Sequence, residues 1–141
     1  MILLDTHALL WMASDPKRLS RRAHEAICNA RQGTGIAVAT ITQWEIAWLA
    51  HQQRTLVAGS VESSVRETVV RVILKPVTAE IAALAVRLPE TFPRDPADRL
   101  IASTAMVEGM PLVTADARIR QSKVLDTVWE ASEFGMAQAG R

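Results

Sequence analysis

The chain opens with a short apolar run that ends on a carboxylate, Ile2-Leu3-Leu4-Asp5. Apolar residues in a row, without polar alternation, are typical of a strand that is buried on both faces of a parallel sheet. The pattern recurs closely at Leu112–Asp116 and more loosely at Ile36–Ala39, which is followed by Glu45. Ligands of an open parallel sheet bind outside the carboxyl ends of its strands. The repeated pattern therefore predicts a group of acids at one edge of such a sheet.

Helix-forming segments separate these apolar runs, which predicts an α/β fold. We expect a three-layer sandwich in which helices flank a mostly parallel central sheet. The length of 141 residues suits one domain, expected over residues 1–135, followed by a flexible tail at 136–141. The expected strands are Ile2–Leu4, Ile36–Ala39, Ile73–Val77, Pro111–Thr114 and Thr127–Trp129. The expected helices are His7–Ala13, Arg21–Arg31, Thr42–Gln52, Val61–Val72, Ile81–Leu88 and Arg99–Val107, with one helical turn at Ala117–Arg120.

Composition excludes few classes of function. Sixteen Lys and Arg against fifteen Asp and Glu leave a net charge of +1, so bulk charge argues neither for nor against a nucleic-acid partner. The single cysteine, Cys28, excludes an intrachain disulfide and supports no cysteine metal site. The N-terminus has no basic region and no apolar segment long enough for a signal peptide or a membrane span. We therefore expect a cytoplasmic protein without membrane contact.

Four acids from separate segments should meet at one edge of the sheet. Asp5 and Asp116 each follow a buried strand, and Glu45 lies in the first turn of the helix that leaves the second strand. The helix that begins near Asp98 ends just before the strand at 111–114, so it runs antiparallel to that strand. Its N-terminus therefore returns to the same edge. Asp98 and Glu45 also share a helix side with apolar residues and should point inward.

Most of these acids also fit a purely structural role. Glu45, three residues after Thr42, completes the pattern of a capping box. Residues 95–98 form an N-cap, a proline at the first helical position and a favourable carboxylate in the first turn, and Asp116 can cap the turn that follows it. Asp5 has no such role in this interpretation, because a carboxylate directly after an apolar run is costly to bury unpaired.

A cluster of acids needs protonation, basic neighbours or a cation. Two carboxylates about 4 Å apart repel each other by about 4 kcal/mol at an effective dielectric constant near 20. Arg94 and Arg99 are candidate partners but are too few to neutralise the group. Oxygen ligands without Cys or an obligatory His favour a hard ion, Mg²⁺ or Mn²⁺. Such an ion suits phosphodiester hydrolysis, because it polarises the phosphate and lowers the pKa of a bound water.

Four segments resemble, in order and spacing, the motifs of the PIN domain, and more narrowly those of the VapC-type toxins of bacterial toxin–antitoxin pairs. They are Leu4-Asp5-Thr6, Thr42–Ile46, Asp95–Ala102 and Leu112–Asp116. The resemblance covers nearly the full length. It implies a Mg²⁺- or Mn²⁺-dependent endoribonuclease whose catalytic and metal-binding acids are Asp5, Glu45, Asp98 and Asp116.

The resemblance also implies supporting residues and partners. Thr114 matches the family's hydroxyl residue two before the last acid, Thr6 matches the one beside the first acid, and Asp95 matches a frequent but less essential acid. Arg99 is expected to support the acids beside it. Family members act on RNA and are usually homodimers held inactive by a cognate antitoxin, whose tail lies along a groove and can reach the metal site.

Other residues allow more than one interpretation. Trp11, Trp44 and Trp48 are expected in the core rather than at an interface, and His7 should pack or face solvent at the first helix. Several basic residues usually belong to a solvated face but could also hold RNA phosphates, and the sequence does not rank them. They are Lys17, Arg18, Arg21, Arg22, Arg118, Arg120 and Lys123.

Two further classes of protein stay open. A non-catalytic module that binds RNA or protein would use the acids structurally, and Mg²⁺ or Mn²⁺ would then change neither its stability nor the RNA. A phosphoaspartate protein is disfavoured, because the residue two after Asp5 is His7 rather than the Asp of an Asp-x-Asp phosphatase. The adjacent acids and the late Lys of a receiver domain are also missing where they would be expected.

Overall fold

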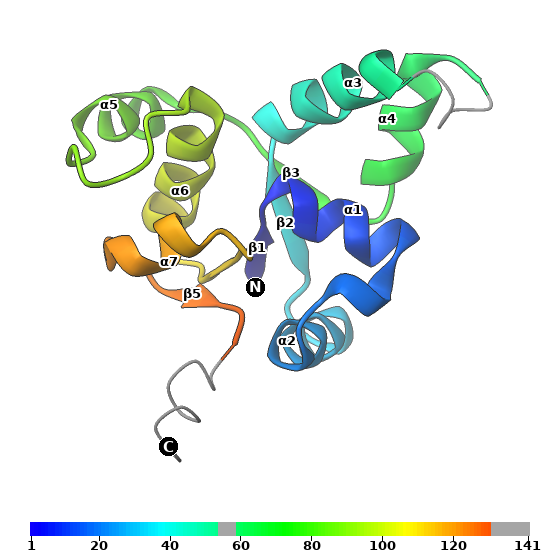
Figure 1. Cartoon of the computed structure of the whole chain (residues 1–141), viewed down its shortest axis with the longest axis horizontal. Helices are drawn as coiled ribbons and strands as arrows, with labels where there is room; N and C mark the ends of the chain where they lie inside the picture. The colour runs from blue at the N-terminus through cyan, green and yellow to red at the C-terminus, as the bar shows by residue number, and fades with distance from the viewer. Residues whose placement is uncertain (54–58, 131–141) are drawn as a thin grey trace.

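In the computed structural model, which describes residues 1–53 and 59–130, a five-stranded parallel sheet lies between two layers of helices (Figure 1). The strand order is β3-β2-β1-β4-β5, so the first strand of the chain is central. Its Leu3 pairs with Ala37 on one side and with Leu112 on the other. The strands are β1 (Ile2–Leu4), β2 (Ile36–Ala39), β3 (Ile73–Lys75), β4 (Leu112–Val113) and β5 (Thr127–Val128).

The two faces of the sheet bury different helices, because successive side chains of a strand point to opposite faces. Leu4 and Val38 pack with α1 and α2, whereas Leu3 and Ala37 pack with α6 and α7. Figure 1 shows α5, α6 and α7 on one side of the strands and α1 and α2 on the other. The helices are α1 (Thr6–Ser14), α2 (Arg21–Gln32), α3 (Ile41–Gln53), α4 (Val61–Val69), α5 (Ala79–Arg87), α6 (Pro96–Glu108), α7 (Ala117–Ser122) and the 3₁₀ turn η1 (Pro16–Arg18).

The predicted α/β sandwich is confirmed, and all five strands are parallel. The helix predicted to reach Val72 ends at Val69, because the chain must turn there to enter β3 and the β-branched residues that follow are weak helix formers. The predicted tail at 136–141 lies outside the described residues. No helix within residues 1–53 and 59–130 combines the length and the apolarity that a membrane span requires.

The prediction that Trp44 and Trp48 lie in the core is wrong. Helix α3 packs inward through Thr42, Ile46 and Ala50, which are buried at a spacing of four residues. The two tryptophans lie on the opposite side of the helix, with 59% and 49% of their surface exposed. Their rings stack on each other with centroids 6.0 Å apart and planes inclined by 9°. An exposed aromatic pair of this kind is typical of a surface that meets a partner.

Candidate active site

The carboxyl edge of the sheet opens into an acidic cleft of about 480 Å³. The ends of β1 and β4 and the N-terminal parts of α1, α3, α6 and α7 surround it. Glu45 lies just after the first turn of α3, one turn later than the sequence predicted, because α3 begins at Ile41. Because β1 and β4 are adjacent and parallel, the acids that follow them lie at the same edge. Every acid singled out in the sequence lines this cleft, namely Asp5, Glu45, Asp95, Asp98 and Asp116.

Asp5 links the central strand to the first helix. Its backbone N–H donates to the carbonyl of Val113 at 3.1 Å, and its carboxylate caps α1 by accepting the N–H of Ala8 at 2.8 Å. The interpretation that denied Asp5 a capping role is therefore wrong, because α1 begins directly after β1. Burial raises the pKa of Asp5, although hydrogen bonds from the Thr114 hydroxyl and from Ala8 oppose the shift.

Buried hydroxyl groups orient Glu45. The Thr6 hydroxyl donates to Oε1 of Glu45, and its oxygen lies 3.1 Å from the hydroxyl oxygen of Thr42. Because a hydroxyl has a single hydrogen, Thr42 must donate to Thr6. Thr42 lies inside α3 rather than before it, so the capping box predicted for Thr42 and Glu45 does not form. The carboxylate of Glu45 is instead held toward the cleft.

The first turn of α6 presents two acids. Asp95 is the N-cap that the sequence predicted, with its Oδ1 accepting the N–H of Ala97 at 2.8 Å and that of Asp98 at 3.2 Å. Burial and then the neighbouring charges of Asp95, Asp116, Glu45 and Asp5 raise the pKa of Asp98 to about 7. Asp98 is therefore partly desolvated and lies near four other carboxylates, and both conditions disfavour its charged form.

One hydroxyl connects the first and the last acid. Asp116 caps α7, accepting the N–H groups of Arg118 at 2.8 Å and Ile119 at 3.2 Å. Its own N–H donates to Oγ1 of the fully buried Thr114 at 3.1 Å, and the Thr114 hydroxyl bonds to Asp5. Thr114 thus fixes the position of Asp5 relative to the turn that carries Asp116.

The sequence interpretation expected Arg99 to support the acids of the cleft, but its side chain points elsewhere. Its guanidinium donates to five backbone carbonyls instead of approaching the acids, and it does not line the cleft. Four of the carbonyls belong to the proline-containing segment 88–93 and the fifth belongs to helix α5, so Arg99 ties α5 and this segment to the start of α6. The acceptors are those of Ala85, Leu88, Pro89, Phe92 and Pro93, at 2.9 to 3.4 Å.

The salt bridges found among the described residues do not involve the acids of the cleft. The ion pairs in the described part of the chain lie elsewhere, at Arg21–Glu25, Arg66–Glu62 and Lys75–Glu108. Within residues 1–53 and 59–130, no three His, Cys, Asp or Glu side chains form a group that could hold a metal ion with the side chains as they stand. The residues fit a divalent cation by their chemistry, because they offer oxygen donors and mutual repulsion that a cation would remove.

Comparison with known proteins decides the family. The family profile of the PIN domain matches residues 2–125. The chain belongs to the PIN-domain family. Ribonuclease VapC22 of Mycobacterium tuberculosis is 43% identical to this PIN-domain chain over 122 residues, which are 86% of this chain and 92% of that protein. The resemblance to PIN domains and to VapC-type toxins is thereby confirmed.

Solved structures of low identity share the same PIN-domain fold. VapBC2 from Rickettsia felis, bound to a promoter DNA fragment, has a chain that aligns with a TM-score of 0.69 at 17% identity, covering 92% of this chain and 100% of that one. A toxin–antitoxin complex from Klebsiella pneumoniae aligns with a TM-score of 0.63 at 20% identity, covering 88% and 93%. These likenesses establish the fold, while the roles of the individual acids stay predictions.

Removing the charge of Asp98 should stabilise the metal-free protein most at alkaline pH. Because the pKa of Asp98 is higher in the folded state than its ordinary 3.8, its contribution to stability falls as the pH rises from 3.8 to about 7. In EDTA, Asp98→Asn should raise the melting temperature more at pH 8 than at pH 5, as measured by calorimetry. Asp126→Asn, an exposed acid outside the cleft, is the control. An equal gain at both pH values would contradict this reading of the site.

Arg99→Ala should lower the free energy of unfolding by about 3 kcal/mol, because several carbonyl groups of the loop lose their donor. Arg99→Lys should recover only part of the loss, since an ammonium group lacks the planar fork of the guanidinium. Urea denaturation gives the free energy of unfolding of Arg99→Ala, Arg99→Lys and Asp98→Asn, and of the double variant that combines Arg99→Ala with Asp98→Asn. A coupling above about 0.5 kcal/mol between Arg99 and Asp98 would show that Arg99 neutralises the acids after all.

Proposed function

We propose that this PIN-domain protein is a metal-dependent endoribonuclease that works in the cytoplasm as the toxin of a toxin–antitoxin pair. The observation that carries the proposal is the cleft in which Asp98 lies among four other carboxylates and has its pKa raised to about 7. Such a cluster is unfavourable until a cation binds. The 43% identity with ribonuclease VapC22 supports RNA as the substrate.

The metal would be Mg²⁺ or Mn²⁺, held by Asp5, Glu45, Asp98 and Asp116. When bound, it would polarise the phosphate and lower the pKa of an attacking water. The chain's own contribution is to hold these carboxylates at the cleft against their repulsion.

Different parts of the chain hold the carboxylates in place. Thr114 bonds to Asp5 and to the backbone of Asp116, and Thr6 bonds to Glu45. Asp95 caps the helix that carries Asp98 and so fixes the direction of its first turn. Anchoring of this kind is what keeps catalytic groups in a productive geometry.

The proposed partners are a cognate antitoxin and a second copy of the chain. Support comes from the solved relatives of this fold, one of which is a toxin–antitoxin complex. Exposed apolar side chains supply surface for such contacts. Trp44 and Trp48 stack on the outer side of α3, and Val86 is exposed on α5. Aromatic residues of this kind are frequent anchors of protein interfaces.

Cleavage of RNA should require both a divalent ion and Asp98. With Mg²⁺ or Mn²⁺, the wild-type protein should cut single-stranded RNA, and Asp98→Asn should lower the rate by about 100-fold, because metal-assisted stabilisation contributes several kcal/mol. EDTA should abolish cleavage by the wild type. Mapping of the new RNA ends in total RNA measures both effects, with Asp126→Asn as the control.

A different result would favour a non-catalytic binding module. In that case the wild type would leave RNA intact with either metal, and neither ion would change the melting temperature. Full activity of Asp98→Asn would instead remove Asp98 from the set of essential acids.

A further inference from the structure

One wall of the acidic cleft is basic and aromatic. His7, Trp11 and Arg18 line the same cleft as the five acids. An RNA strand that enters the cleft brings a phosphate at every nucleotide, and carboxylates repel phosphates. A metal held by the acids would offset this repulsion only at the bond that is cut. The neighbouring phosphates need a positive partner of their own, which this wall supplies.

Arg18 is placed and available for such a contact. It ends the 3₁₀ turn η1 and is exposed. Its guanidinium carbon lies 4.6 Å from the centroid of the Trp11 ring, within the range of a cation–π interaction. No hydrogen bond or ion pair uses this guanidinium within the part of the chain that the structure describes. Its donors therefore stay available for a ligand.

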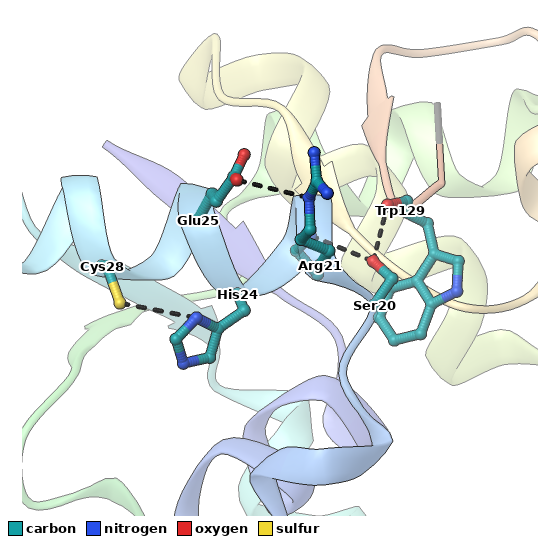
Figure 2. Close-up of polar contacts among 7 residues, drawn as sticks. Ser20, Arg21, His24, Glu25, Cys28 and Trp129 are labelled. Carbon is teal, nitrogen blue, oxygen red and sulfur yellow. Dashed lines mark hydrogen bonds and ion pairs between the residues drawn. The ribbon is translucent and has the colours of Figure 1, made fainter. Parts of the chain in front are cut away.

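The ring under Arg18 is itself held by other aromatic groups. Trp11 packs against Trp129 with centroids 5.9 Å apart and against His7 with centroids 5.8 Å apart. Trp129 follows β5, and its carbonyl accepts a hydrogen bond of 2.6 Å from the hydroxyl of Ser20, the N-cap of α2 (Figure 2). The contacts of Trp129 with Trp11 and of Trp11 with Arg18 therefore join the edge of the sheet to the rim of the cleft.

We propose that Arg18, seated on Trp11, binds the RNA phosphate next to the bond that is cut and so positions the strand across the acids. This inference rests on the proposed ribonuclease function. A guanidinium matches a phosphate through two parallel hydrogen bonds. Because the Trp11 ring already orders the long Arg18 side chain, less conformational entropy is lost when RNA binds. Arg18 is the substrate-binding residue, and Trp11 is a positioning residue that acts through it.

The test measures RNA binding in the full chain carrying Asp98→Asn, so that the RNA stays intact. Fluorescence anisotropy with a labelled single-stranded oligoribonucleotide gives the Kd over a range of KCl concentrations. Arg18→Ala should weaken binding about tenfold, as expected for loss of a charged hydrogen bond. It should also reduce the slope of log K against log salt by about 0.7, the value for one phosphate contact on a single strand.

Matched variants separate the contact from a structural effect. Arg18→Lys should keep the salt slope but bind more weakly, because it retains the charge without the planar fork. Trp11→Leu should weaken binding as Arg18→Ala does, whereas Trp11→Phe should restore it by keeping an aromatic ring. Arg87→Ala, an exposed arginine outside the cleft, should change neither quantity. In the otherwise wild-type enzyme, Arg18→Ala should raise KM about tenfold and leave kcat nearly unchanged.

Two results would overturn the proposal. One is an unchanged Kd and salt slope for Arg18→Ala while Asp98→Asn still lowers the rate of cleavage about 100-fold, which leaves the ribonuclease function intact. The other is a loss of affinity with an unchanged salt slope, which shows that Arg18 acts only on the fold. If the wild type cleaves no RNA, the ribonuclease proposal fails instead, and the binding measurements still decide whether Arg18 contacts a phosphate.

Discussion

Repulsion between carboxylates is the constraint on which this site depends. Burial raises the pKa of Asp98 most, and the charges of Asp95, Asp116, Glu45 and Asp5 raise it further. Side chains with this much repulsion would separate if they were free. They stay together because each is attached to a strand end or to the N-terminal part of a helix, and because the hydroxyl groups of Thr114 and Thr6 hold Asp5 and Glu45. The apolar core of the sheet therefore sustains a charge cluster that is unfavourable in itself.

The sheet and its acidic edge are largely predictable from the sequence. Ile2–Leu4 and Ile36–Ala39 are short apolar runs, each followed by a polar residue, and both form inner strands of the sheet. Parallel strands end at the same edge, so the acids that follow them meet there without further information. The cap at Asp95 is equally predictable, because a proline at the first helical position and an acid before it form a local pattern.

The features that the sequence does not predict depend on contacts between residues that no local sequence pattern identifies. Arg99 bonds to backbone carbonyls of a loop, and any residue type supplies a carbonyl. Helix α3 is apolar on several sides, so periodicity does not say that Trp44 and Trp48 face outward. Asp5 caps α1 because the helix begins with no intervening loop, and the length of that connection is a property of the folded backbone. The Trp11–Arg18 contact joins separate elements.

Acids of the cleft also cap helices, and the capping role does not require their negative charge. An N-cap requires an oxygen acceptor, and asparagine serves about as well as aspartate. The folded state therefore has no need of the negative charge on Asp5 or Asp116, both of which cap a helix. Replacing Asp5 or Asp116 with asparagine would keep the oxygen that caps the helix. It would also remove a negative charge and so relieve the repulsion between the acids. Under the proposed function, a lineage under pressure to silence this protein could lose cleavage through such a change and keep a fold as stable as that of its ancestor, so disabled copies would persist in cells as stable proteins.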